Sequence, residues 1–415
     1  MKNDKIYDIA ILGAGAAGLM AAIAARRAGA CIAVLEKNEY AGRKLYATGN
    51  GRCNVLNRTA TAEDYRSGEG IAAAFAADVF AQCGPAQLQA LFETLGLDTV
   101  EEGEGRLYPR SLQAASVVRA LERGAFEKVP GCGGPAELIC GFEAKEARRD
   151  PDGSFCVTAA DGRIVKARRL LIASGGKAGI QYGCEGRGLK IAESLGHRIV
   201  RPIPALTGFV CEETGLLEKL AGVRVRGTVR LYAQQEGASP VLLSRDTGEI
   251  QFNKDSVSGI CVMNVSGYYR RRGEERFFLS LDVLPELDEA ALAEKLARRE
   301  ASLGDYFLDA LLPEKLAAAV MELAEKEGKT AGSVARLLKD LTFTPAASKG
   351  WKDAHTTSGG IALDEIDPKT MESKLVPGLY AAGEALDVDG PCGGYSLTWA
   401  FASGWIAGQD AARNR

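Results

Sequence analysis

The sequence predicts an α/β fold, in which a two-dinucleotide-binding-type (Rossmann-like) domain is interrupted by an insert with a β-barrel-like part and a small helical part. Three observations predict it: a strand, glycine turn and helix at the N-terminus, a strand ending in Gly-Glu near the C-terminus, and a change of pattern between them. We therefore expect a nucleotide-binding domain from residues 1–196 and 346–415, a β-rich insert at 197–285 and a helical insert at 286–345.

The first forty residues read as a βαβ unit. Residues 6–12 are a short apolar run bounded by glycine, and residues 16–28 have the Ala-rich composition of a helix that stops at Gly29. Residues 31–35 are a second apolar strand, which ends on Glu36. A parallel pair joined by a helix is the start of a doubly wound sheet.

Later segments extend this sheet and then depart from it. Asp-Gly pairs punctuate residues 138–165 and predict a small antiparallel meander, and residues 169–173 form an apolar strand that we expect to rejoin the first sheet. The remaining predictions are helices at 72–97, 112–122, 287–303, 316–327 and 331–341, and strands at 223–233, 241–243 and 379–382.

Composition narrows the class of protein. The 415 residues carry a net charge of −3, which gives no global argument for a nucleic-acid or membrane partner. The chain starts without the features of a signal peptide and has no run of about 18 apolar residues. Its ten cysteines include no C-x-x-C pair, and it has two histidines. We therefore predict a cytoplasmic protein with no membrane association, no metal site and mostly reduced cysteines.

A G-x-G-x-x-G turn follows the first strand. Its glycines Gly13, Gly15 and Gly18 let the backbone turn tightly and approach a pyrophosphate at the helix N-terminus, and Glu36 can accept hydrogen bonds from ribose hydroxyls. A carboxylate would repel a 2′-phosphate, which leaves FAD or NAD. The predicted contacts of this region also include Ala16, Ala17 and Lys37.

Two further segments decide between these cofactors. The strand that ends in Gly383-Glu384 resembles the segment by which two-dinucleotide-fold flavoproteins hold the ribityl chain of FAD, for which an NAD dehydrogenase has no use. Helix N-terminal amides can also face the flavin where negative charge collects on reduction. The other predicted flavin contacts are Ser174, Gly175, Gly176, Gly393, Gly394, Tyr395 and Ser396.

Longer motifs make a family recognisable. They are residues 41–54 (A-G-R-K-L-Y-A-T-G-N-G-R-C-N), 105–111 (G-R-L-Y-P-R-S), 257–260 (V-S-G-I) and the stretch from 371–374 (M-E-S-K) through 378–395. On these motifs the chain resembles, over nearly its whole length, the BaiN/RdsA family of NAD(P)/FAD-dependent oxidoreductases, also known as HI0933-like, YhiN-type or aminoacetone-oxidase-like flavoproteins. Two departures are a histidine, His355, ahead of T-T-S-G-G, and Ser396 in place of the usual asparagine.

The first motif can serve a flavin dinucleotide. Gly42 can let the chain pass the pyrophosphate, and Arg43 and Lys44 can offset its charge. A glycine-flanked set of donors can then lie beside the flavin ring: Thr48, Gly49, Asn50, Gly51 and Asn54.

Candidate catalytic residues are His355, Tyr395 and Arg52, which could orient a substrate carbonyl oxygen or supply a proton, with Tyr108 as a further candidate. We expect Cys53 and Cys392 to be packed thiols without a redox role. His197 follows a helix end and is predicted to lie at the surface as a C-cap. The run Arg270–Arg272 is expected to be solvated.

The resemblance implies a reductase. Family members reduce a C=C bond conjugated to a carbonyl, either the uracil of ribosomal RNA to dihydrouridine or a small enone such as an unsaturated 3-oxo bile acid. We expect FAD to carry the hydride and NAD(P)H to be the reductant, although no second G-x-G-x-x-G unit is present. Arg224, Arg226 and Arg230 favour RNA as the acceptor. The alternatives are a flavin-dependent amine oxidase and a non-catalytic flavin- or RNA-binding module.

Overall fold

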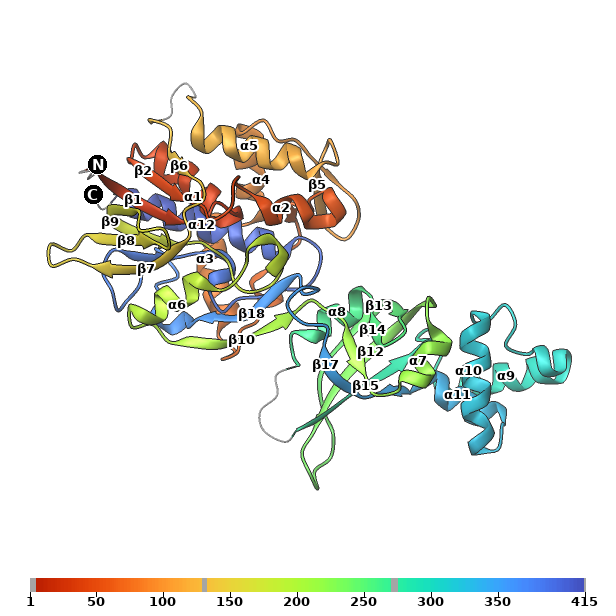
Figure 1. Cartoon of the computed structure of the whole chain (residues 1–415). Coiled ribbons are helices and arrows are strands. Elements are labelled where there is room, and N and C mark those ends of the chain that lie inside the picture. Colours follow the sequence, from red (N-terminus) through yellow and green to blue (C-terminus); the bar gives the residue numbers. More distant parts are fainter. Residues whose placement is uncertain (1–4, 129–132, 270–274, 414–415) are drawn as a thin grey trace. The chain divides into compact units, whose positions relative to one another are not determined.

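The computed structural model describes residues 5–128, 133–269 and 275–413, and the basic run Arg270–Arg272 lies outside these ranges. The chain forms two compact units (Figure 1). The first contains the residues up to Ile203 together with those from Thr356 onward, and the second is Pro204–His355. The predicted α/β class is confirmed, with a Rossmann-type first unit made from both chain ends.

The first unit is built on a mixed seven-stranded sheet in the order β6-β2-β1-β9-β8-β7, with β19 also paired to β9. Parallel pairs join β1 to β2, β2 to β6, and β9 to both β1 and β19, whereas β7 and β8 are antiparallel. The strands are β1 (Ile6–Leu12), β2 (Ile32–Leu35), β6 (Glu137–Ile139), β7 (Ala144–Arg149), β8 (Phe155–Ala159), β9 (Ile164–Ile172) and β19 (Leu379–Ala381).

One long strand joins the two ends of the chain. The N-terminal half of β9 pairs with β8, and its C-terminal half, from Leu170 to Ile172, pairs with β19. The predicted return of residues 169–173 to the first sheet is therefore confirmed. Since β9 also lies beside β1, the glycine turn after β1 and the segment after β9 meet at the same edge of the sheet.

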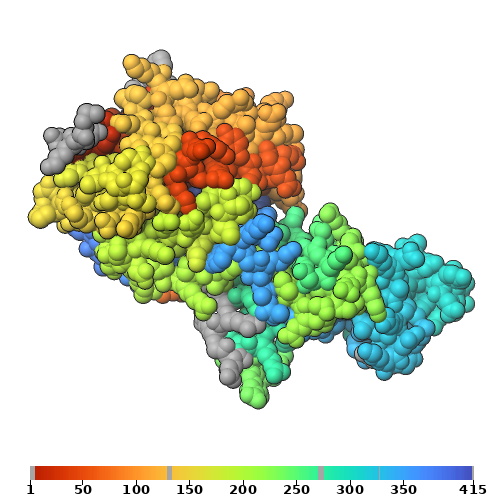
Figure 2. Space-filling model, viewed as in Figure 1, coloured from red at the N-terminus to blue at the C-terminus, as the bar shows by residue number. Residues whose placement is uncertain are grey.

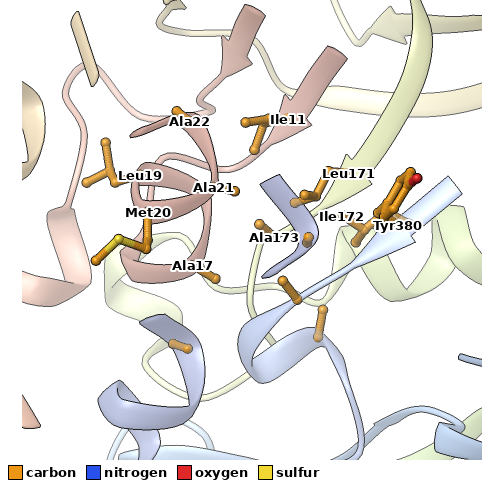
Figure 3. Close-up of a cluster of buried hydrophobic side chains, with 14 of the residues drawn as sticks. Ile11, Ala17, Leu19, Met20, Ala21, Ala22, Leu171, Ile172, Ala173 and Tyr380 are labelled. Atoms are coloured by element: carbon orange, nitrogen blue, oxygen red, sulfur yellow. The ribbon is translucent and has the colours of Figure 1, made fainter. Parts of the chain in front are cut away.

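Helix α1 (Ala16–Arg27) packs directly on α12 (Tyr395–Arg413). A Cβ atom added at Gly404 would lie 2.4 Å from the Ala17 carbonyl oxygen, and one at Gly408 would lie 2.2 Å from that of Ala21. Only glycine allows such an approach. Figure 3 shows Ala17 and Ala21 of α1 in one buried cluster with Ile11 of β1, Leu171 of β9 and Tyr380 of β19.

The predicted helix at 72–97 is instead two helices, α3 (Ala72–Cys83) and α4 (Pro85–Thr94). Gly84 is extended and Pro85 begins the next helix, because proline lacks the N–H that a continuous helix would use. The other elements of this unit are α2 (Arg43–Ala47), α5 (Ala114–Phe126), α6 (Arg187–Ser194), a ribbon of β10 (Ile199–Ala205) with β18 (Thr356–Ile361), and a small sheet of β3 (Leu56–Asn57), β5 (Arg106–Pro109) and β4 (Thr99–Glu101).

The second unit has a seven-stranded antiparallel sheet in the order β16-β15-β12-β13-β14-β11-β17. Its edge strands β16 and β17 are separated along the chain by Thr344 alone, so the two edges meet and the sheet curls as expected of a barrel-like part. The strands are β11 (Phe209–Cys211), β12 (Arg224–Gln234), β13 (Val241–Phe252), β14 (Ser256–Ser258), β15 (Arg276–Asp282), β16 (Leu341–Phe343) and β17 (Pro345–Ser348).

A continuous hydrophobic core joins this sheet to the helices. It contains Phe252 and Leu281 from strands together with Leu316 and Val334 from helices. The helices are α7 (Thr214–Leu220), α8 (Ile260–Ser266), α9 (Glu289–Leu303), α10 (Glu314–Ala324) and α11 (Ala331–Lys339). The division of this region at residues 285 and 286 stays a prediction.

The prediction for His197 is wrong in one respect. Its backbone N–H does cap α6, donating to the Ala192 carbonyl, but its side chain is buried. Nδ1 lies 2.9 Å from Glu365 Oε2 and Nε2 lies 2.8 Å from Ser373 Oγ. Ser373 Oγ already accepts from two backbone N–H groups, so its own proton goes to Nε2 and the imidazole donates from Nδ1. A carboxylate and a turn, both distant in sequence, bury this ring.

We expect His197→Ala to lower the free energy of unfolding by about 2–3 kcal/mol, because it removes the hydrogen bonds of the ring with Glu365 and Ser373 and leaves a cavity where the buried ring was packed. The exposed His355 provides a matched control, since His355→Ala should change stability by less than about 0.5 kcal/mol. Urea unfolding of both variants measures the difference. Equal effects would mean that the buried network adds no stability.

Candidate functional site

The glycines of the turn after β1 differ in what an added Cβ atom would contact. A Cβ at Gly18 would lie 1.9 Å from the Gly13 carbonyl oxygen, and one at Gly13, where φ is +100°, would lie 2.7 Å from Ser174 Cα. These two glycines are required by packing. A Cβ at Gly15 meets nothing within 4 Å, so this glycine leaves open space at the N-terminus of α1. The open space is where a pyrophosphate would approach helix amides.

Glu36 is fixed beside this turn. Its Oε2 atom accepts a hydrogen bond from the Ala14 N–H, and Oε1 accepts from the backbone and side chain of Asn38. The carboxylate is 8% exposed and is held in place without any ligand. It retains acceptor capacity for a ribose hydroxyl, because a carboxylate offers about four lone-pair sites.

The predicted cations of this region have protein partners. Lys37 pairs with Glu185 at 2.7 Å, and Arg43 Nη1 donates to Asn38 Oδ1 at 2.9 Å. Figure 2 shows the red surface of this N-terminal segment beside the yellow-green surface that follows β9, in agreement with the Lys37 pair. The Lys37–Glu185 pair joins the 36–43 segment to the 182–187 segment, and the Arg43–Asn38 hydrogen bond lies within the first of these segments.

The motif at residues 41–54 is bound to the glycine turn by its backbone. The Gly42 N–H donates to the Ala14 carbonyl at 2.8 Å, and its φ of +70° is left-handed. Gly49, Asn50 and Gly51 also have positive φ in succession. A left-handed run of this kind is costly for most residues, and glycine and asparagine tolerate it best. The composition of the motif is thus explained by its backbone path.

Glu384 forms an ion-paired network with protein groups. Its Oε2 lies 2.7 Å from Lys44 Nζ, while Oε1 accepts from the backbone N–H and the hydroxyl of Thr357. Thr357 Oγ1 in turn accepts from the N–H groups of Lys177 and Ala178. Burial alone would lower the pKa of Lys44, but the Glu384 carboxylate together with Cys184 and Tyr182 more than offsets this and raises the pKa. Lys44 is therefore a permanent cation in the site.

The segment before α12 contacts the 54–57 strand. A Cβ at Gly394, where φ is +96°, would lie 2.6 Å from the Leu56 carbonyl carbon and oxygen, and Asn57 Nδ2 donates to the Gly393 carbonyl. Gly394 is therefore needed for this close backbone approach. The contact places Asn54 and Ser396, two predicted flavin contacts, on touching segments.

Several buried polar atoms in the predicted cofactor segments have no hydrogen-bond partner. They are Asn54 Oδ1, Ser174 Oγ and Ser396 Oγ. A buried hydroxyl or amide without a partner costs about 1–3 kcal/mol, so such atoms indicate a missing partner. A flavin dinucleotide carries hydrogen-bonding groups along its whole length. The donor and acceptor set of these segments therefore fits FAD.

The catalytic candidates are distributed over both units. Arg52 pairs with Glu102 and lies over the Tyr108 ring at 4.5 Å. The Tyr395 carbonyl accepts a hydrogen bond from the Tyr65 hydroxyl at 2.9 Å. Both belong to the first unit, whereas His355 is exposed and is the last residue of the second.

Sequence reasoning missed a buried acidic pair that supports this region. Asp389 is 2% exposed, lies 2.6 Å from Arg66 Nε and accepts from the Ser358 hydroxyl at 2.7 Å. Asp387 Oδ2 accepts from the Gly68 N–H. The D-x-D-G-P stretch just before Gly393 was the available signal, because two carboxylates among apolar residues and glycines need buried partners.

Two observations concern metal binding and membrane helices. Within the described ranges, no group of three or more His, Cys, Asp and Glu side chains is arranged to hold a metal ion. No helix in the same part of the chain has both the length and the apolar character needed to cross a membrane.

Comparison with known proteins gives matches along nearly the whole chain. The family model described as HI0933-like protein Rossmann domain matches residues 7–410. The 3-dehydro-bile acid delta(4,6)-reductase of Clostridium scindens is 34% identical, with 97% of this chain and 98% of that protein covered. The ribosomal RNA dihydrouridine synthase of Escherichia coli is 28% identical with the same coverage. A solved flavocytochrome c3 fumarate reductase has 16% identity and a TM-score of 0.48, over 99% of this chain and 79% of that one.

We expect Gly15→Ala to weaken FAD binding about tenfold or more, because the added methyl group fills only the space in which a pyrophosphate would lie. Stability without FAD should change little. Gly215→Ala is the matched control, since that helical glycine also faces open space, in the second unit. Titration of the FAD-free proteins with FAD measures the effect. Unchanged affinity in Gly15→Ala would place the pyrophosphate elsewhere.

Cys53 should be an unreactive thiol. It is fully buried, and burial raises its pKa to about 11 although a hydrogen bond with Thr48 opposes the shift. The thiolate, which is the reactive form, would then be about one part in a thousand at pH 8. We expect iodoacetamide at pH 8 to modify the exposed Cys31 in the native protein and Cys53 only after unfolding. Mass spectrometry locates the label, and rapid native labelling of Cys53 would contradict the assignment.

Proposed function

Because the chain belongs to the HI0933-like family and is an FAD-dependent oxidoreductase, we propose that it reduces a carbon–carbon double bond conjugated to a carbonyl group, with NAD(P)H as the reductant. The names of the two relatives describe related chemistry. A 3-dehydro-bile acid delta(4,6)-reductase and a dihydrouridine synthase each saturate a double bond in a ring that carries a carbonyl. The acceptor is accordingly a small enone or a uracil of ribosomal RNA.

The observation that carries the cofactor assignment is the set of unpartnered buried polar atoms in three segments that are far apart in sequence. We assign the pyrophosphate to the open face of Gly15 with the α1 amides, and the ribose to Glu36. Asn54, Ser174 and Ser396 would hold the remainder, with Lys44 as the nearby positive charge. When bound, FAD supplies a hydride donor for the β-carbon of the acceptor.

The chain's own residues must bind the acceptor carbonyl and supply a proton to the α-carbon. Burial and the Asp64 charge raise the pKa of Tyr395, so its hydroxyl keeps its proton at neutral pH and can donate it. Arg52 can donate a hydrogen bond to a carbonyl oxygen, and its contacts with Glu102 and Tyr108 hold its orientation. His355 can donate from an exposed position.

We expect Tyr395→Phe or His355→Ala to slow acceptor reduction about a hundredfold while the FAD absorbance of the holoenzyme stays normal, because general acids contribute about that much. Tyr306→Phe is the matched control, since this tyrosine is 69% exposed in the second unit. Anaerobic assays with NADH or NADPH and a cyclic enone or a uridine-containing RNA measure the rate. Unchanged rates in both variants would remove the two residues from the catalytic set. Reduction of the holoenzyme by an amine, with neither acceptor reduced, would favour an amine oxidase instead.

A further inference from the structure

In the described part of the second unit, the outward positions of β12 and β13 on one face of the sheet are exposed or half-buried. Strands β12, β13 and β15 lie side by side (Figure 1), and alternate residues of β12, such as Val229 and Leu231, are fully buried in the core. The intervening residues of β12 point the other way and are exposed or half-buried. We call this outward side the arginine face. Its members on β12 are Arg224, Arg226, Thr228, Arg230 and Tyr232.

The pairing of the strands concentrates positive charge on the arginine face. Arg230 is directly opposite Arg245 of β13. Like charges at directly opposed positions destabilise a sheet, and Asp282 pairs with Arg230, so a further anion would stabilise the pair by binding Arg245. The outward positions of the three strands carry Arg224, Arg226, Arg230, Arg245 and Arg276, against Glu249 and Asp282.

The two carboxylates on this face do not neutralise it. Asp282 is buried and is shared between Arg230 at 3.5 Å and Lys339 at 2.7 Å. Glu249 lies 3.6 Å from Arg224. Within the described part of the chain, Arg245 is exposed and has no ion-pair partner. This local excess of arginine contrasts with the net charge of −3 of the whole chain.

An aromatic pair stands beside these arginines. Tyr232 of β12 and Phe278 of β15 are cross-strand neighbours whose ring centroids are 5.1 Å apart with an interplanar angle of 13°. Both rings are half-buried, and Leu242, opposite Tyr232, is 45% exposed. Aromatic rings on an open sheet beside arginines are the arrangement by which proteins bind single-stranded nucleic acid, with bases stacked on the rings and phosphates on the arginines.

We propose that the arginine face docks a single-stranded segment of RNA, with phosphates on Arg226, Arg230 and Arg245 and a base against Tyr232 and Phe278. This rests on the proposed function, in which a uracil of ribosomal RNA is one possible acceptor, and it selects that substrate class. An enone with at most one negative charge would leave most of these arginines unmatched. An acidic peptide would match the charge but gives no role to the stacked rings.

The test is binding of a fluorescein-labelled twelve-residue oligouridylate to the holoenzyme, followed by anisotropy over a range of salt concentrations. We expect Arg245→Ala to weaken binding about fivefold or more and to reduce the slope of log Kd against log salt by about 0.7, the value for one lost phosphate contact on a single strand. Arg298→Ala, at an exposed arginine of α9, is the control and should change neither quantity. Tyr232→Leu keeps the apolar contact and should weaken binding at least about fivefold with no change in slope.

Three results would overturn the proposal: no binding of the oligouridylate, equal losses in Arg245→Ala and Arg298→Ala, or equally effective displacement by polyglutamate. The wild-type protein separates this proposal from the proposed function. Reduction of a small enone without RNA binding would contradict RNA docking on the arginine face and would support the proposed reductase function. RNA binding through the arginine face, with no acceptor reduced under any condition, would support the docking proposal and contradict the reductase function.

Discussion

The contact of one helix backbone with another is the constraint on which the first unit depends. Helix α12 approaches α1 so closely that Gly404 and Gly408 touch carbonyl oxygens of Ala17 and Ala21. The same α1 is joined to β1 by a turn in which Gly18 touches the Gly13 carbonyl. Because these contacts admit no Cβ atom, the N-termini of both helices are held at fixed places. One of these termini borders the open space at Gly15, and the other follows Gly394.

Three carboxylates also hold segments of the first unit together. Glu36 joins the glycine turn to Asn38, Glu384 joins Lys44 to Thr357, and Asp389 joins Arg66 to Ser358. Each carboxylate contacts two separate segments of the chain, and each accepts hydrogen bonds from protein groups. A site held in this way is largely formed before a cofactor arrives, so little ordering cost is added to binding.

The parts that could be predicted from the sequence are those specified by local chemistry. The glycine turn, the first βαβ unit and the helices α9, α10 and α11 follow from patterns that span a few residues, whereas α7 and α8 were not predicted. The contacts that were missed join residues far apart. His197 was expected at the surface because its local signal is a helix end, whereas Glu365 and Ser373, which bury it, lie in another part of the chain. The Lys44–Glu384 pair was not predicted because the two residues are far apart in sequence, and each alone was interpreted as a cofactor contact.

The two units differ in how freely their residues can change. This difference is consistent with relatives of similar length whose names give a bile acid or ribosomal RNA as substrate. The glycine turn and the unpartnered atoms that fit a flavin lie in the first unit. A side chain in place of Gly13 or Gly18 would meet backbone there. The second unit leaves and rejoins the first through the paired strands β10 and β18, as a single excursion of the chain. The exposed positions of its sheet alternate with core positions, so they can change without loss of the core. The second unit can therefore change at its surface while the glycine turn and the core of both units are kept.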